Sequence, residues 1–313
     1  MSVIRKISTI TAVTAIAATL QSCVYQYGPD GPGEGMRVTF DWNQAPDAQP
    51  EGMGVLMFPK GRDFSSRYDF RPAGGTATIH DGDYDIITLN NDYTQVLVLN
   101  DNDYSTLTLT TTEANPADGA SVLSQGMAQP PRGRSEGQPV MTAPETIWTD
   151  ALPDRHCHNG GTLTLTPRRV TATYRVTVDS IENLKSAAQA SMAISGLALG
   201  YSPADSTAID YTVTVPGKLR KSGQTSLTGT LVNWGKAPGA NTVYLYVYIW
   251  LTDGTKRMYE FDVTGQVTES ETKPDANIHV TGIELPEIEN TVSGGMDVAV
   301  DNWETIYIEL SLS

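Results

Sequence analysis

Few side chains in this sequence combine reactive types with a spacing that would bring them together. The triplet His156-Cys157-His158 would place two imidazoles on one face of a strand and the thiol on the other. A metal site needs three or four converging ligands, and the other two histidines lie far away in the sequence. The acidic stretch 100–103 lacks the glycine and the terminal glutamate of a calcium loop. We therefore expect neither a metal nor another cofactor.

Two common catalytic motifs are missing as well. The sequence contains no H-E-x-x-H and no G-x-x-x-x-G-K-[ST] segment. A Ser-His-Asp set or a pair of glycosidase carboxylates stays formally open, but no residue pattern points to either. We expect a protein that is not an enzyme.

One cysteine has a clear chemical context. A short basic region is followed by a weakly apolar run and then by Leu-Gln-Ser-Cys, which ends at Cys23. As a helix, residues 7–20 would rise about 21 Å, short of the ~30 Å hydrocarbon core, so residues 1–22 predict a cleaved export signal. The ending resembles a bacterial lipobox, in which the cysteine carries diacylglycerol; the alternative is an ordinary secretory signal with a chance cysteine. We expect an acylated Cys23 that anchors the chain in a membrane, followed by a flexible tether over 23–35.

The composition favours strands in an exported protein. Only 18% of the 313 residues are charged, and Thr and Ser fill many polar positions. Thr suits a pleated surface and weakens helices. The formal net charge of −15 repels nucleic-acid phosphates, so we expect no nucleic-acid partner.

Alternating apolar residues predict strands along most of the chain. Val38, Phe40 and Trp42 alternate with polar residues, and residues 170–178 repeat that pattern. No helical period is sustained for long, although residues 181–192 contain enough Ala and Leu for a short helix. The pattern predicts an all-β protein built from sandwich-type domains.

Changes in composition indicate where the domains divide. Residues 115–144 contain five prolines with several Gly and Ser, which we interpret as a long exposed loop. Residues 200–206 have the composition of an interdomain joint. We expect an N-terminal sandwich over 36–204 and a C-terminal sandwich over 205–313.

The strand over 243–251 is apolar on both faces. Its candidate aromatic contact face consists of Tyr244, Tyr246, Tyr248 and Trp250. Aromatic rings of this kind can stack on sugars or contact proteins. The alternative, which the second apolar face favours, is that the rings pack on a neighbouring sheet.

The last strand of the sequence is a candidate partner strand. Its alternating aliphatic residues are Ile306, Ile308, Leu310 and Leu312. Such a strand can add to the sheet edge of another subunit through main-chain hydrogen bonds. The alternative, which we favour, is that it completes its own sheet.

Several short segments occur in an order that is typical of a known family. They are the lipobox ending at Cys23, Val38-Thr39-Phe40-Asp41-Trp42, Gly52-Met53, Gly82-Asp83-Tyr84-Asp85, Asn90-Asn91-Asp92, Asp262-Val263-Thr264, and Gly294-Gly295-Met296 to Trp303. In this order the sequence resembles the fimbrillin-related lipoproteins of Bacteroidota-type bacteria. The resemblance implies two transthyretin-like, Greek-key β-sandwich domains and a place in surface fimbriae.

The resemblance also bears on the role within a fimbria. Shaft-forming members are cut after a basic residue, which frees a groove for a neighbour's strand. Here Arg37 lies within the first strand, and Arg132 and Arg134 lie in the Pro-rich loop, so no such processing site is evident. We expect a structural or adhesive accessory or anchor subunit at the outer membrane, which assembles with other fimbrial subunits. The alternative is a glycan-binding lipoprotein of a polysaccharide-uptake system.

Overall fold

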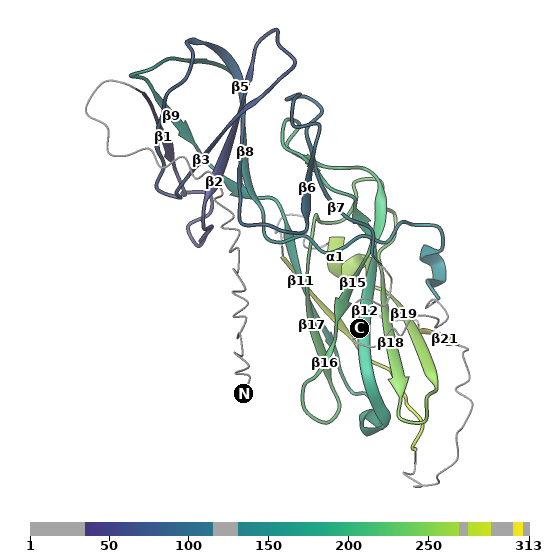
Figure 1. Cartoon of the computed structure of the whole chain (residues 1–313). Coiled ribbons are helices and arrows are strands. Elements are labelled where there is room, and N and C mark those ends of the chain that lie inside the picture. Colours follow the sequence, from purple (N-terminus) through teal and green to yellow (C-terminus); the bar gives the residue numbers. More distant parts are fainter. Residues whose placement is uncertain (1–34, 115–130, 269–274, 289–302, 309–313) are drawn as a thin grey trace, which may run out of the picture.

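The chain folds almost entirely into β-strands (Figure 1). The computed structural model describes residues 35–114, 131–268, 275–288 and 303–308. Within these ranges the helical elements are the short α1 (Thr264–Thr268) and two 3₁₀ turns, η1 (Gly133–Ser135) and η2 (Leu184–Ser186). The predicted all-β class is therefore confirmed.

Two sheets pack face to face in the N-terminal part. Sheet 1 has the order β4 (Gly75–Ala77), β1 (Met36–Phe40), β9 (Thr162–Leu165). Sheet 2 has the order β10 (Arg168–Arg169), β8 (Trp148–Cys157), β5 (Gly82–Asn90), β2 (Met53–Pro59), β3 (Ser66–Phe70). Val38 and Leu163 from sheet 1 meet Val55 and Ile86 from sheet 2 in one buried core. Alternation along each strand supplies this inward row, as the sequence predicted.

A small third sheet covers the other face of sheet 2. Sheet 3 has the order β14 (Thr207–Ala208), β13 (Tyr201–Ser202), β7 (Thr108–Thr111), β6 (Val96–Leu99). Leu56 and Ile87 of sheet 2 pack here with Leu109, and Trp234 joins them from the following part of the chain. Because strands β2 and β5 carry apolar residues on both faces, both faces of sheet 2 are covered.

A second pair of sheets forms the C-terminal part. Sheet 4 has the order β16 (Arg220–Lys221), β17 (Leu227–Asn233), β11 (Ala172–Val178), β20 (Asp275–Val280). Sheet 5 has the order β15 (Thr212–Lys218), β12 (Ala187–Ala198), β18 (Tyr244–Leu251), β19 (Lys256–Asp262), β21 (Trp303–Ile308). Val176 and Ile278 of sheet 4 face Leu245 and Phe261 of sheet 5 in the largest buried core.

Strand partners change between β10 and β11, near residue 170. β10 pairs with β8 in sheet 2, whereas β11 pairs with β17 and β20 in sheet 4. The predicted division at 204 and 205 instead follows β13, where Tyr201 pairs with Leu109 and ties sheet 3 together. Strand pairing therefore groups residues 172–198 with the C-terminal sheets.

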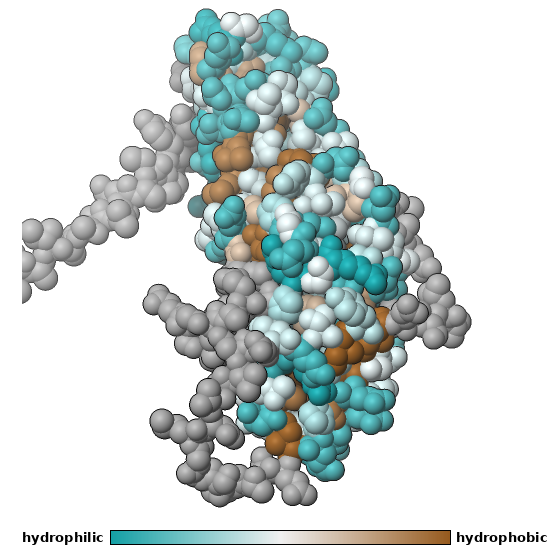
Figure 2. Space-filling view, turned by 90° about the vertical axis from the view of Figure 1, so that its right-hand side faces the viewer, coloured by the Kyte–Doolittle hydropathy of each residue, from teal (hydrophilic) through white to brown (hydrophobic). Residues whose placement is uncertain are grey.

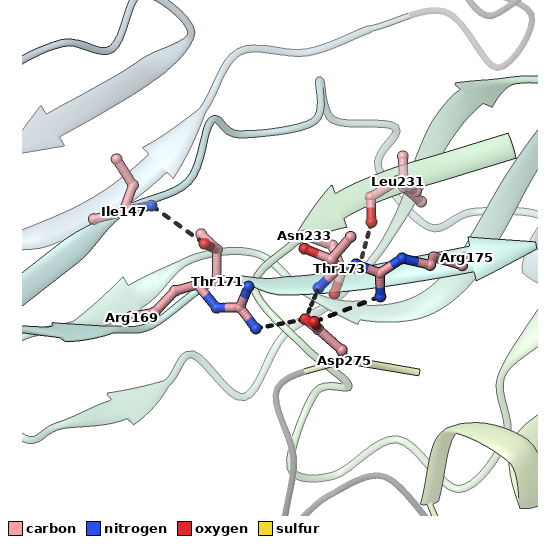
Figure 3. Close-up of polar contacts among 8 residues, drawn as sticks. All are labelled: Ile147, Arg169, Thr171, Thr173, Arg175, Leu231, Asn233 and Asp275. Carbon is pink, nitrogen blue, oxygen red and sulfur yellow. Dashed lines mark hydrogen bonds and ion pairs between the residues drawn. The ribbon is translucent and has the colours of Figure 1, made fainter. Parts of the chain in front are cut away.

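An ion pair spans this change of partners (Figure 3). The Asp275 carboxylate on β20 accepts a hydrogen bond from Arg169 on β10, with 2.5 Å between Nη2 and Oδ1. The Thr173 backbone N–H donates to the same oxygen at 3.0 Å, and Arg175 Nη1 lies 3.5 Å from the other oxygen. One carboxylate thus connects sheet 2 to sheet 4.

Two local predictions were wrong. The short helix expected at 181–192 is the single turn η2 followed by the start of β12, whose residues pair with β15 and β18. Long-range pairing here outweighs the helix propensity of Ala and Leu. The loop expected to be exposed over 115–144 begins outside the described residues, but its described part packs against sheet 5, where Ser135 is fully buried.

Candidate functional site

The candidate partner strand lies at the edge of sheet 5. β21 pairs in parallel with β19 through six residue pairs. Ile306 and Ile308 are half-buried against the core between sheets 4 and 5, whereas the Tyr307 side chain is 60% exposed. Leu310 and Leu312 lie outside the described residues. In this structure the strand completes its own sheet while it occupies an edge position.

The candidate aromatic contact face lies on the opposite side of sheet 5 from the main core. Tyr246 and Tyr248 are fully buried, and Tyr244 and Trp250 are half-buried. The Tyr246 and Tyr248 rings are stacked with 6.5 Å between their centroids. Trp303 from β21 packs edge-on against Trp250, with 5.1 Å between centroids. The rings are buried, as in the alternative of packing on a neighbouring sheet or domain, but none of the described sheets covers them.

Residues 131–138, here called the cover segment, lie over this aromatic face. The Tyr248 hydroxyl donates a hydrogen bond to the Pro131 carbonyl at 3.0 Å. Gln138 Oε1 accepts from the Gly196 backbone N–H at 3.3 Å, which fixes the other end of the cover segment to β12. Burial of the ring raises the pKa of Tyr248, because the phenolate would lose its contact with water.

A buried carboxylate holds the middle of the cover segment. Glu260 on β19 is 3% exposed. Its Oε2 accepts the Arg134 backbone N–H at 3.0 Å, and its Oε1 lies 3.3 Å from Arg134 Nε. Gly133 has a φ of +47°, and a Cβ at this position would lie 2.0 Å from Glu260 Oε2. A buried charge requires such partners, so the backbone conformation at Gly133 is part of the contact.

Arg134 links three neighbouring strands. Its guanidinium contacts Glu260 of β19, lies 5.3 Å from the Tyr244 ring centroid on β18, and lies 5.9 Å from that of Tyr307 on β21. The Arg134 side chain is 59% exposed, so water screens each of these contacts and each stabilises the fold only modestly. The cover segment and the edge strand β21 are therefore in direct contact.

The roles of Arg134 and Glu260 were not predicted from the sequence. The sequence signal for Glu260 was weak, because Glu260 shares its strand face with Met258 but also with the charged Lys256 and Asp262. No comparable signal marked Arg134, since a Pro- and Gly-rich segment has no periodicity from which a packing face can be read.

The remaining candidate residues lie elsewhere. Cys23 is outside the described residues. His156 is exposed and its Nδ1 lies 2.9 Å from Asp83 Oδ1, while Cys157 is buried and burial raises the pKa of its thiol. Among the side chains that the structure describes, no group of three or more His, Cys, Asp or Glu is arranged to hold a metal ion. None of the described helices has the length and apolar character that crossing a bilayer requires.

Among the residues that the structure describes, exposed large apolar side chains are few and scattered. Figure 2 shows one face of the molecule on which separate hydrophobic groups lie among hydrophilic and neutral residues. The large hydrophobic side chains that are most exposed are Phe64, Leu97, Leu99, Tyr211 and Tyr307. Tyr307 belongs to β21, and Leu97 and Leu99 belong to β6, so three of these five side chains lie on edge strands.

A family model described as a domain of unknown function, DUF5119, matches residues 33–217. The chain belongs to the DUF5119 family. The DUF5119 match begins just before β1 and ends within β15, so it spans sheets 1 to 3 and continues into sheets 4 and 5. No curated protein matches the chain.

Solved structures similar to this DUF5119 protein come from Bacteroides and Porphyromonas species. A candidate adhesin from Bacteroides ovatus ATCC 8483 is 17% identical, with a TM-score of 0.64 over 83% of this chain and 95% of its own. A candidate polysaccharide-binding protein from Bacteroides thetaiotaomicron VPI-5482 is 12% identical, with a TM-score of 0.51 over 80% of this chain and 91% of its own. The fimbrial anchor protein Mfa2 from Porphyromonas gingivalis is 13% identical, with a TM-score of 0.49 over 80% of this chain and 90% of its own. The first two similarities show a shared fold.

The contact between Gly133 and Glu260 predicts a specific loss of stability. Gly133→Ala would place a Cβ against Glu260 Oε2 and should lower the free energy of unfolding by about 1–3 kcal/mol in urea titrations. Gly137→Ala is the matched control, since Gly137 also has a positive φ (+91°) but has no atom within 4 Å of the added Cβ. Equal losses in the two variants would show that the carboxylate contact does not hold the cover segment.

The buried Tyr248 hydroxyl predicts a loss of stability at high pH. Because its pKa is raised in the folded state, the folded chain keeps a proton that the unfolded chain releases above a pH of about 10. The free energy of unfolding should therefore fall as the pH rises past that value. Tyr248→Phe should lessen the fall between about pH 9 and 11, whereas Tyr211→Phe, at a ring that is 52% exposed, should not. Parallel curves for the parent and Tyr248→Phe would contradict this assignment.

Proposed function

We propose that this chain is a structural or adhesive accessory or anchor subunit of a surface fimbria, which assembles with other subunits by β-strand addition. The observation that carries the proposal is the position of β21, which pairs with only one strand among the described residues and lies at the edge of sheet 5. An edge strand presents main-chain groups that another chain can pair with. The fold shared with a candidate adhesin supports the same role.

The half-buried state of β21 suits a strand that can change partners. Ile306 and Ile308 contact the core only partly, so moving this strand to another sheet would cost less than moving a fully buried one. The contacts of Arg134 with Tyr307 and Glu260 add a modest, screened stabilisation. The strand can therefore serve its own sheet in the free chain and a neighbour's sheet in an assembly.

The proposal includes the architecture and location inferred from the sequence. Two transthyretin-like β-sandwich domains would correspond to the two pairs of sheets, with sheet 3 between them. Acylated Cys23, after removal of 1–22, would hold the chain at the outer membrane with the tether 23–35 between lipid and sandwich. The protein would act through contacts with other fimbrial subunits and would have no enzymatic activity.

Glycan binding through the aromatic face has less support than strand addition. Tyr246 and Tyr248 have no exposed surface, and the cover segment would have to leave before a sugar could stack on them. One of the similar solved structures is a candidate polysaccharide-binding protein, but its likeness to this chain concerns the fold alone.

Acylation at Cys23 can be tested directly. Cells of the native type of host that express the protein are fed a labelled fatty acid. The protein should then carry the label and fractionate with the outer membrane. Cys23→Ser should abolish labelling, because serine lacks the sulfur atom that would form the thioether to the lipid. Cys157→Ser is the matched control, since the sequence contains only these two cysteines. Label retained in Cys23→Ser would rule out the lipid anchor.

Strand addition predicts that the end of the chain is needed for assembly. Deleting residues 305–313 should abolish cross-linking to fimbrial partners on intact cells. The double variant Ile306→Asn, Ile308→Asn should also reduce assembly, because it removes the apolar side chains that a partner sheet would bury. Glu304→Gln on the same strand is the control and should assemble normally. Unchanged assembly in the folded deletion variant, verified by circular dichroism, would refute strand addition through β21.

A further inference from the structure

A cleft of about 330 Å³ opens between sheets 1 and 2, where the chain passes from β8 to β9. These strands lie in the N-terminal part of the molecule, at the upper left of Figure 1. Met36, Leu152 and Leu163 give the cleft apolar walls. Its polar lining includes Arg155, His158, Thr162 and Thr164. Polar groups line more of the cleft than apolar groups do, so the lining suits a polar ligand.

A β-bulge directs Arg155 into this cleft. Between the pairs Tyr84↔Arg155 and Ile86↔Leu152, β8 has one residue more than β5, and Asp154 in the bulge has a φ of +54°. The bulge places Leu152, Arg155 and Cys157 on the same face, toward sheet 1. Arg155 is exposed and forms no ion pair with the residues that the structure describes, whereas the neighbouring Asp154 pairs with Lys60.

The open edge of β9 provides further hydrogen-bonding groups beside Arg155. The carbonyls of Gly161 and Leu165 accept the backbone N–H groups of Arg37 and Asp41, so they point toward β1. By alternation, the main-chain groups of Thr162 and Thr164 point to the other side, where β9 has no strand partner in the described ranges. His158 lies against the same turn, since a Cβ at Gly161 would be 3.2 Å from its Nε2.

We propose that this cleft binds a carboxylate-bearing sugar unit, such as a hexuronate. The guanidinium of Arg155 matches a carboxylate with two parallel hydrogen bonds. The main-chain groups of Thr162 and Thr164 match sugar hydroxyls, and the apolar walls can pack against the C–H groups of a pyranose ring. The chain has a net charge of −15 and would repel a densely charged polymer, so a single carboxylate fits the site better. The inference goes beyond strand addition, because the cleft lies outside sheet 5.

The test is a ligand-observed NMR titration of the purified full-length chain at constant ionic strength. The probes are galacturonate and glucuronate, compared with galactose and glucose. We expect at least tenfold tighter binding of one of the acids than of its neutral counterpart. Arg155→Gln should remove this difference, because it removes the charge, and Arg155→Lys should retain part of it. Arg220→Gln, at an exposed arginine of β16, is the control and should leave binding unchanged.

Three results would overturn the proposal. The first is equal binding of acidic and neutral sugars, and the second is unchanged hexuronate binding in a folded Arg155→Gln variant. The third is competition by acetate or N-acetylalanine as effective as that by hexuronate, which would show that the cleft recognises a carboxylate without the sugar. Because Arg155 is exposed, its variants should melt within a few degrees of the parent, which the same samples verify. Assembly through β21 would be unaffected by any of these outcomes.

Discussion

Strand β18 imposes the constraint on which the C-terminal half of the molecule depends. It is apolar on both faces, so it can be stable only where both faces are covered. Leu245, Val247 and Ile249 satisfy one face in the core with sheet 4. The other face presents tyrosine rings, and none of the described sheets packs there. The cover segment and Trp303 fill this place, and the Glu260 carboxylate comes to lie beneath them.

Local patterns in the sequence predicted the strands well and their partners poorly. Alternation identified the strand class throughout, including the two-faced character of β18. It could not show that β11 pairs with β20, which lies about 100 residues further along the chain, because pairing depends on contacts that no local window contains. The same limit explains the helix expected at 181–192, where a long strand is stabilised by neighbours on both sides.

The candidate site was likewise predicted from the sequence only in part. The aromatic residues and the apolar residues of β21 stood out because their spacing follows a strand. What covers or borders them did not, because Arg134 belongs to a segment without periodicity, and the bulge that turns Arg155 inward depends on one extra residue in β8.

The parallel pairing of β21 with β19 has a kinetic and thermodynamic consequence. Since both strands belong to one polypeptide, β21 meets its own edge at an effective concentration that is commonly on the order of millimolar for tethered segments. A strand from another molecule competes with it as a second-order event. Exchange would therefore be negligible among dilute chains and would become favourable only at a high local concentration or for a strand that fits the β19 edge more closely. Self-pairing of this kind protects the edge of β19 from indiscriminate pairing with other chains.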